Sequence, residues 1–238
     1  MSAPLLSTTE FLERLRSEGA SRYHDRHAFN ARMHTGTLSR GELQRWVVNR
    51  FYYQTRIPIK DALIVSKSED PVFRRMWIHR VTDHDGTKEG EGGLELWLRL
   101  AEGVGLDREE VRSLRHVLPA VRFACDGYVE LVRARSLVEA VASSLTEYFA
   151  PDIMSKRIAA WEQHYPWAAL GPTLDYFKSR VPRAARDAEE AIAFVQREAT
   201  TRQMQERCVD ALVRKCEVLW SLLDAVESPT AMPKPIAP

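Results

Sequence analysis

Residues 39–55 read Ser-Arg-Gly-Glu-Leu-Gln-Arg-Trp-Val-Val-Asn-Arg-Phe-Tyr-Tyr-Gln-Thr, and the pattern of this stretch decides the fold. Ser39 and Glu42 fit a capping box, in which the serine hydroxyl accepts from a first-turn amide and the glutamate reaches back. Apolar residues then recur every three or four positions, which is the period of an α-helix. Ser7 and Glu10 repeat the start signal. We therefore expect a helix to begin at each of these two points.

The rest of the chain has the same helical period. Its 11 glycines and 12 prolines stand mostly between apolar-periodic stretches, and no alternating strand pattern is convincing. Further helices are predicted over 70–86, 94–103, 107–115, 119–134, 136–149, 151–164 and 173–180, with a last long helix from Pro182 to about Ala225. No repeat of solenoid length is present. The sequence predicts an all-α protein, a compact bundle of about seven helices.

Length and charge limit the class of protein. The 238 residues are 45% hydrophobic and 28% charged, which is typical of a globular domain. Thirty-four lysines and arginines against 33 aspartates and glutamates leave a net charge of +1, so we expect no general binding to nucleic acid or to an anionic membrane surface. No apolar run approaches the ~18 residues of a membrane span, and no signal-peptide pattern is present, so we expect a cytoplasmic protein.

Residues 1–227 are predicted to form a single helical catalytic domain. Over residues 228–238, four prolines in eleven residues predict a stiff tail or linker. Cys125, Cys208 and Cys216 form no C-x-x-C pair, so we expect them to be reduced packing residues.

Polar side chains share the phase of the apolar residues in several predicted helices. Arg50 and Gln54 follow Leu43 and Val47 at helical spacing, so both are expected to point inward. The same spacing places these further side chains on inner faces: Arg80, His84, Tyr128 and Lys215. These complete the set of inward polar candidates: Thr146, Glu147, Arg157, Tyr176 and Arg180.

A buried cation without an anion costs several kcal/mol, and several cations in one interior cost more. One carboxylate, that of Glu147, cannot neutralise the five inward cations named above. The sequence therefore predicts an internal pocket that receives a small polycarboxylate or phosphate ligand. His84 and the two inward tyrosines supply groups that can transfer protons. For any one of these residues alone, packing with a solvated polar tip is the commoner explanation, so the hypothesis depends on their joint pattern.

Motifs of several enzyme classes are absent. None of the seven histidines has a glutamate three residues before it, as a di-iron bundle requires. H-E-x-x-H, G-x-S-x-G, the P-loop and G-x-G-x-x-G do not occur. The sequence therefore supports neither a zinc protease nor a serine hydrolase nor a nucleotide-binding loop. His24 and His27 are spaced for one helix face, but no third ligand is implied, so no metal ligands are assigned.

Six stretches of the chain form a family signature. They are Tyr23-His24, Trp46–Thr55, Asp83–Gly86, Arg115–Ala124, Ser143–Pro151 and Gln163–Trp167. Over about residues 7–226 the chain resembles the pyrroloquinoline-quinone synthase family. The resemblance implies a homodimeric bundle of the haem-oxygenase-like type that binds no haem. It also implies the last step of pyrroloquinoline quinone (PQQ) biosynthesis, in which a bicyclic, tricarboxylated quinone precursor (AHQQ) undergoes ring closure and eight-electron oxidation by dioxygen.

The implied reaction releases hydrogen peroxide and needs neither a metal nor an organic cofactor, with dioxygen as co-substrate and PQQ as product. By position, the resemblance makes His84 the main acid/base, lets Tyr176 and Arg180 close over the site and hold oxygen or peroxide, and adds His24 as a further catalytic group. The substrate-binding side chains that it implies are Tyr23, Arg50, Gln54, Arg80, Tyr128, Thr146, Glu147, Arg157 and Lys215.

Two departures from the family pattern are visible. Met154 stands where the family has a substrate-contacting histidine, so Met154 is not included among the candidates. Residues 168–175 differ in length and contain Gly171-Pro172, which makes this segment the expected mobile lid.

Other functions stay open at this point. A haem-degrading enzyme of the same fold would need a proximal histidine in an apolar slot, and a thiamin-degrading one would need a nucleophilic cysteine, for which Cys125 is a candidate. Another binder of a small polycarboxylate, or a non-catalytic helical adaptor that joins a partner through its tail, is also open. The expected partners are the quinone substrate, a second copy of the chain and a small carrier-like protein of the same pathway (PqqD), the last bound through the C-terminal tail.

Overall fold

The computed structural model describes residues 4–228, and within this range the chain is helical and contains no strand. The described elements are α1 (Thr8–Arg22), η1 (His24–Arg26), α2 (Ala28–His34), α3 (Arg40–Ser66), α4 (Pro71–Asp85), α5 (Gly92–Gly103), α6 (Arg108–Arg112), α7 (Pro119–Ala134), α8 (Leu137–Ser143), η2 (Ser144–Phe149), α9 (Ala150–His164), η3 (Gly171–Leu174), α10 (Asp175–Glu198) and α11 (Arg202–Glu227), where η marks a 3₁₀ helix. The all-α prediction is confirmed.

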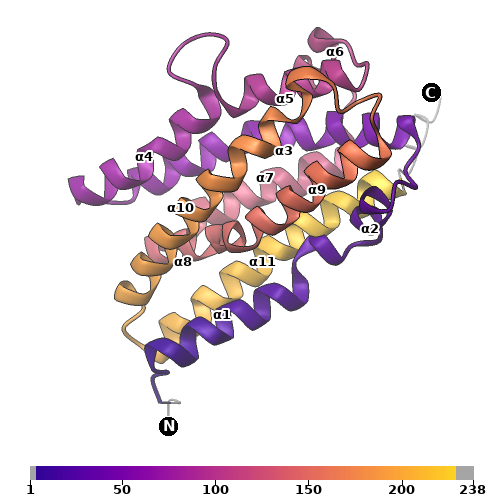
Figure 1. Cartoon of the computed structure of the whole chain (residues 1–238). Helices are drawn as coiled ribbons and strands as arrows, with labels where there is room; N and C mark the ends of the chain where they lie inside the picture. Colours follow the sequence, from indigo (N-terminus) through magenta and orange to yellow (C-terminus); the bar gives the residue numbers. More distant parts are fainter. Residues whose placement is uncertain (1–3, 229–238) are drawn as a thin grey trace, which may run out of the picture.

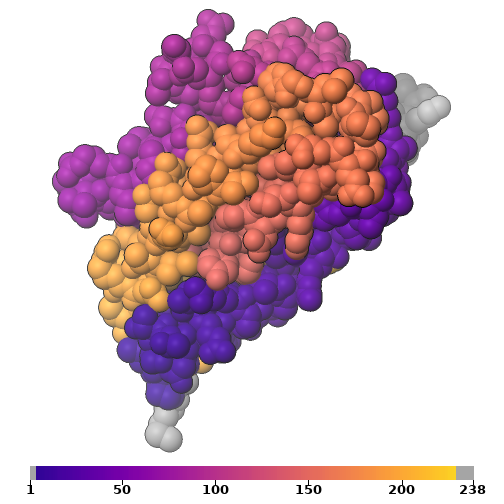
Figure 2. Space-filling view, in the orientation of Figure 1, coloured from indigo at the N-terminus to yellow at the C-terminus, as the bar shows by residue number. Residues whose placement is uncertain are grey.

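The long helices run side by side to form an elongated bundle (Figure 1). α1 packs along α11, α9 packs along α10, and α3 contacts α4, α5 and α7. In the space-filling view, α9 and α10 form a continuous surface on one side of the molecule (Figure 2). No helix in the described part of the chain is both long and apolar enough to cross a membrane.

The two predicted capping boxes are present. The Ser7 hydroxyl accepts from the Glu10 amide at 3.3 Å, and the Glu10 carboxylate accepts from the Ser7 amide at 2.8 Å. Ser39 and Glu42 make the same two bonds at the start of α3. Each box satisfies two backbone amides that a helix start otherwise leaves without partners, so both helices begin where the sequence predicts.

α3 is the central helix of the bundle. Nine consecutive residues, 46–54, are buried, which is possible only where other helices surround a helix. The ring of Trp46 lies 5.4 Å from that of Trp97 on α5 and 6.3 Å from that of Trp161 on α9. These aromatic contacts join three helices in one apolar core. Polar side chains that share the buried stretch of α3 must therefore find partners inside the protein.

The limits predicted for the last helix are wrong. Instead of one helix over 182–225, α10 continues through Pro182 to Glu198, and α11 begins at Arg202. Pro182 removes one backbone hydrogen bond, and the packing of α10 against its neighbours compensates for that loss. The break falls instead at Thr201, whose hydroxyl accepts from the Met204 amide at 3.1 Å and so caps α11.

The predicted helix over 136–149 also changes character midway. It is α-helical to Ser143 and then continues as the 3₁₀ helix η2. The Ser143 hydroxyl donates to the Ala140 carbonyl at 2.7 Å, a local bond that competes with regular helix geometry. The tighter turn presents Thr146 and Glu147 to the interior of the bundle.

Two further predictions concern the chain between and after the long helices. No residue of the expected lid, 168–175, lines the cavity described below, and Thr173 and Leu174 are buried, in a segment that packs on α5. The segment is therefore not placed as a lid over that cavity. The proline-rich tail predicted over 228–238 lies outside the described residues except for Ser228, which caps the end of α11.

Candidate functional site

A small cavity, with a volume of about 30 Å³, lies inside the bundle. Its wall is formed by Tyr23, Arg50, Tyr53, Gln54, Ile57, His84, Thr146, Glu147, Ala150, Met154, Tyr176, Arg180 and Leu219. Eight of the thirteen predicted site residues are on this wall. The five that are not are His24, Arg80, Tyr128, Arg157 and Lys215.

Four of those five lie behind the wall in a buried layer. The Lys215 ammonium donates to the Tyr53 hydroxyl at 2.7 Å and lies 3.4 Å from the centre of the Tyr128 ring. The guanidinium of Arg50 lies 4.0 Å from the centre of the Tyr53 ring. Tyr53 thus connects the wall to the deep layer. Arg157 completes this layer, and its guanidinium lies 5.1 Å from the centre of the Trp46 ring.

Three cations of this region have no carboxylate partner in the part of the chain that the structure describes. Arg157 donates to the amide oxygen of Asn30 at 3.0 Å, and no carboxylate among residues 4–228 lies within ion-pair distance of Arg50, Arg157 or Lys215. Burial and then the charge of Arg50 lower the pKa of Arg157 from its ordinary 12.5 to about 9. The same two causes lower the pKa of Lys215 well below its ordinary value. In both cases burial is the larger cause and the neighbouring positive charge the smaller one, and a bound anion would offset both.

His24 has the least satisfied side chain in the deep layer. Its ring is buried, and neither ring nitrogen has a hydrogen-bond partner within the described residues. Burial, with the charges of Arg50 and Arg157, lowers the pKa of His24 well below 6.5, so the ring is neutral at physiological pH. A buried polar group without a partner costs about 1–3 kcal/mol, which a ligand that bonds to it would recover.

His84 faces the cavity from α4. Its Nδ1 atom lies 3.1 Å from the Arg80 carbonyl oxygen. Because a carbonyl can only accept, Nδ1 must carry the hydrogen, and the neutral ring then has its lone pair on Nε2. Burial, followed by the charge of Arg180, lowers the pKa of His84 from 6.5 to about 4. His84 is therefore a neutral histidine with a free proton-accepting nitrogen at physiological pH.

Tyr176 and Arg180 enter the cavity from α10, one turn apart. The Tyr176 hydroxyl donates to the Gln54 side-chain oxygen at 2.8 Å, which leaves the amide nitrogen of Gln54 free to donate. Arg180 donates to the Glu147 carboxylate at 2.6 Å. Although burial disfavours a charged guanidinium, the Glu147 carboxylate raises the pKa of Arg180 above its ordinary value. Arg180 is thus a fixed positive charge beside His84.

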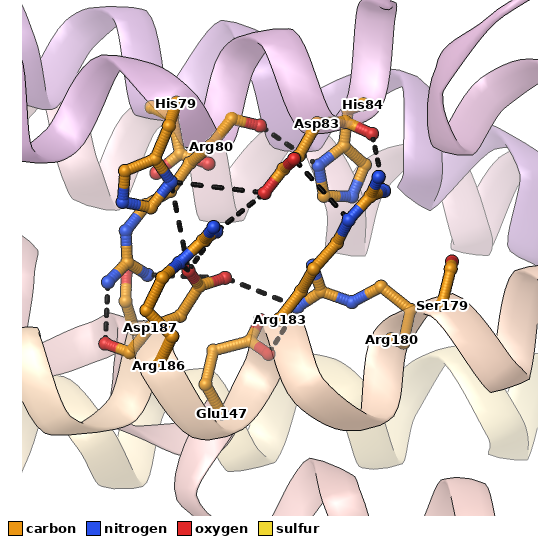
Figure 3. Close-up of polar contacts among 12 residues, drawn as sticks. His79, Arg80, Asp83, His84, Glu147, Ser179, Arg180, Arg183, Arg186 and Asp187 are labelled. Atoms are coloured by element: carbon orange, nitrogen blue, oxygen red, sulfur yellow. Dashed lines mark hydrogen bonds and ion pairs between the residues drawn. The ribbon is translucent and has the colours of Figure 1, made fainter.

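Arg80 does not reach the cavity. It donates to the Asp187 backbone carbonyl at 2.5 Å, lies 3.8 Å from the Asp187 carboxylate, and covers the Trp77 ring (Figure 3). Glu190 lies 3.5 Å from the same guanidinium. The expectation that Glu147 is the only available anion is therefore wrong. Asp187 and Glu190 were missed because they stand in a stretch of α10 that is rich in both basic and acidic residues and has no distinguishing pattern.

The cavity wall also contains residues that were not predicted. Tyr53 follows Arg50 by three positions on the buried part of α3, and this spacing is a signal that would have found it. Met154 lies on the wall although it was left out of the prediction. The others are the apolar residues Ile57, Ala150 and Leu219.

Neither a nucleophilic cysteine nor a metal centre is favoured here. Cys125 is absent from the wall, and burial raises the pKa of its thiol to about 12, so the thiol stays protonated. His79, Asp83 and Asp187 have potential metal-ligand atoms within 4.8 Å of one another. Their carboxylates, however, already bind guanidinium groups, namely those of Arg80, Arg180, Arg183 and Arg186. So much positive charge disfavours a divalent cation.

Sequence comparison places the chain among known enzymes. The model of the TENA/THI-4/PQQC family matches residues 12–225. The chain is 47% identical to a pyrroloquinoline-quinone synthase from Acidiphilium cryptum, with 98% of this chain and 95% of that protein covered. It is 48% identical to one from Ectopseudomonas mendocina, with 99% and 93% covered. It is also 48% identical to a bifunctional coenzyme PQQ synthesis protein C/D from Methylorubrum extorquens. That match covers 93% of this chain and 59% of the relative.

Solved structures share the fold at low sequence identity. A domain with a haem oxygenase-like fold from Shewanella denitrificans superposes on this chain with a TM-score of 0.72 at 16% identity. The match covers 94% of this chain and 93% of the solved chain. A TenA homologue from P. horikoshii gives a TM-score of 0.72 at 13% identity, with 91% and 97% covered. The predicted haem-oxygenase-like bundle is thereby confirmed.

Proposed function

The chain belongs to the TENA/THI-4/PQQC family, and on that premise we propose that it is a pyrroloquinoline-quinone synthase, an oxidoreductase that uses dioxygen as acceptor. Its reaction is the last step of PQQ biosynthesis, the ring closure and eight-electron oxidation of a tricarboxylated quinone precursor. We propose further that hydrogen peroxide is released and that the enzyme uses no metal or organic cofactor.

The set of uncompensated buried cations is the observation that carries this proposal. Arg50, Arg157 and Lys215 have no carboxylate partner among the described residues, and the proposed substrate has three carboxylates. Charge-assisted bonds between a guanidinium and a carboxylate are roughly twice as strong as neutral ones. A trianionic ligand would therefore offset the cost of burying these three cations. An uncharged ligand would not.

The proton chemistry follows from the state of His84. Its Nε2 lone pair accepts a ring proton from the bound precursor, which makes the ring system electron-rich. Electrons then pass directly from this substrate to dioxygen. Arg180 supplies a fixed positive charge where superoxide or peroxide develops, and Tyr176 supplies a hydroxyl beside it. The substrate thus does the redox work that a cofactor does in other oxidases.

Anaerobic mixing followed by oxygen tests this function. The precursor is added to the protein without oxygen, absorbance is recorded, and air-saturated buffer is then added. We expect a spectral change on anaerobic binding, then the PQQ spectrum and hydrogen peroxide only after oxygen enters. Conversion without oxygen, or no conversion with it, would contradict the proposal.

A non-catalytic adaptor is the alternative from another class. It predicts no stabilisation by PQQ, whereas a site occupied at 100 times its dissociation constant stabilises the folded state by about 2.7 kcal/mol. Thermal unfolding with and without PQQ distinguishes the two.

We also propose that the protein forms a homodimer through an exposed face of α7. Phe123 is 84% exposed there, and a Cβ added at Gly127, one turn along the same face, would meet no atom within 4 Å. Antiparallel packing of two α7 helices about a twofold axis between these positions places each Phe123 over the other copy's Gly127. The face is therefore complementary to itself.

A carrier-like protein of the same pathway is the second proposed partner. The Methylorubrum extorquens relative is named as a bifunctional protein C/D, and this chain covers 59% of it. We therefore propose that this chain binds a separate protein D, with the C-terminal tail as the contact.

A further inference from the structure

The buried Asp187 carboxylate is the centre of a network of polar contacts between α4 and α10 (Figure 3). Asp187 is 2% exposed, on α10. Three guanidinium groups surround its carboxylate, those of Arg186 at 2.9 Å, Arg180 at 3.6 Å and Arg80 at 3.8 Å. Asp187 itself does not line the cavity, and its contact with the cavity wall is through Arg180.

Arg180 is held by two carboxylates that lie in different places. Glu147, at 2.6 Å, is on the cavity wall, where an entering polyanion would repel it and compete for the same guanidinium. Asp187, at 3.6 Å, lies outside the cavity. Its attraction for Arg180 therefore persists when the cavity is filled.

We propose that Asp187 is a positioning residue that fixes the Arg180 guanidinium at the cavity while it anchors Arg80 outside it. The consequence for catalysis rests on the proposed function, but the positioning does not. Arg180 must be in place when negative charge develops on dioxygen, and a displacement of about 1 Å can cost on the order of a hundredfold in rate. Loss of the Asp187 charge should therefore slow oxidation more than it weakens ligand binding.

The network offers a matched control in Asp83. Asp83 belongs to the same contact between α4 and α10 and binds Arg183 and Arg186, but it touches neither Arg180 nor Arg80. Asp83→Asn therefore removes an equivalent ion-pair partner between these helices without releasing the cavity arginine. Asp187→Glu keeps the charge and serves as the conservative variant.

The first test is NMR spectroscopy of the arginine guanidinium groups in the ligand-free protein, with every variant made in a Glu147→Gln background that removes the competing carboxylate, and with the Arg180 signals assigned from Arg180→Lys. In this background alone, and with Asp83→Asn added, we expect Arg180 signals that show slowed rotation and slow exchange with water. In Asp187→Asn we expect both the rotation of the Arg180 guanidinium and its hydrogen exchange with water to become fast. In Asp187→Glu we expect both to be partly slowed again. Unchanged Arg180 signals in Asp187→Asn would overturn the proposal whether or not the protein is a PQQ synthase.

The second test is steady-state kinetics of peroxide formation, with PQQ affinity measured in parallel. We expect kcat of Asp187→Asn to fall on the order of tenfold to a hundredfold. We expect its PQQ dissociation constant to stay within about threefold of the wild-type value and Asp83→Asn to keep wild-type kcat. Equal losses in both variants, or a wild-type kcat in Asp187→Asn, would show that Asp187 has only a structural role. A wild type without turnover would contradict the proposed function and leave the NMR result to decide the positioning.

Discussion

The neutral ring of His84 has a hydrogen on one nitrogen and a free lone pair on the other, and its surroundings select this tautomer. The Arg80 carbonyl fixes the hydrogen on Nδ1, and burial with the charge of Arg180 keeps the second proton away. The two effects together yield a base that is ready at neutral pH. The helical spacing of residues 73–84 predicted that His84 faces inward, but only the structure identifies the free nitrogen.

Replacing His84 should separate binding from chemistry. In His84→Asn the carboxylate-binding cations are untouched, so we expect PQQ affinity to stay within about threefold, whereas loss of the base lowers peroxide formation by on the order of 10²–10⁴. Titration with PQQ and a peroxide assay measure the two effects. His116→Asn, at an exposed site, is the control. Wild-type turnover in His84→Asn would rule out the assigned role.

The low pKa of His84 also predicts how stability depends on pH. Unfolded His84 takes up a proton near pH 6.5, and the folded protein does so only near pH 4, so the folded state loses stability as pH falls through this window. We expect the loss between pH 7 and pH 4 to be about 3 kcal/mol smaller in His84→Asn than in the wild type. Urea unfolding at the two pH values measures it. Equal losses in both proteins would mean that the pKa of His84 is not lowered.

At the scale of helices, the sequence predicted where helices begin more accurately than where one helix breaks into two. Both capping boxes are local patterns of four residues, so the sequence identifies them directly. The boundary between α10 and α11 was missed because Pro182, the strongest local helix breaker, lies inside a helix that packing maintains, while a single threonine marks the true break. The short helices η1 and α2 were not predicted, and with α2 the partner of Arg157, Asn30, was missed.

The boundary at Thr201 can be tested by a single substitution. Thr201→Ala removes the hydroxyl that accepts from the Met204 amide, and we expect the free energy of unfolding to fall by about 1 kcal/mol. Thr200→Ala, next to it and exposed, should change stability by less than about 0.5 kcal/mol. Chemical denaturation of both variants checks this. Equal effects would indicate that Thr201 does not cap α11.

At the scale of the whole molecule, the sequence predicted which side chains point inward but not how they are paired. Helical phase places Arg50, Gln54, His84, Tyr176 and Arg180 on the cavity wall. Thr146 and Glu147 reach it from η2, and Tyr23, which only the resemblance supplied, reaches it from the end of α1. Pairing across helices depends on tertiary geometry, so sequence spacing could not show that Arg80 binds Asp187, nor that Arg50, Arg157 and Lys215 have no carboxylate partner among residues 4–228. The resemblance to the family supplied the reaction, and the structure shows which cations are available to bind its substrate.

The proposed dimer is tested at the same scale. Phe123→Asp places a charge at the centre of the α7 face, so we expect a shift from dimer to monomer in light scattering. Gly127→Leu fills the complementary position and should have the same effect, because a Cβ added at Gly127 meets no atom within 4 Å in its own subunit. Arg112→Ala, an exposed change on α6, should leave the dimer intact. A monomeric wild type, or dimeric forms of both α7 variants, would contradict this interface.

The most direct measurement compares the binding of PQQ with that of its trimethyl ester, which keeps the ring system and removes all three negative charges. If buried cations hold the ligand through its carboxylates, calorimetric titration should show tight binding of PQQ and no measurable binding of the ester. Arg50→Ala should then weaken PQQ binding by about 2–5 kcal/mol. Equal affinity for acid and ester, or undiminished PQQ binding in Arg50→Ala, would contradict this basis of recognition.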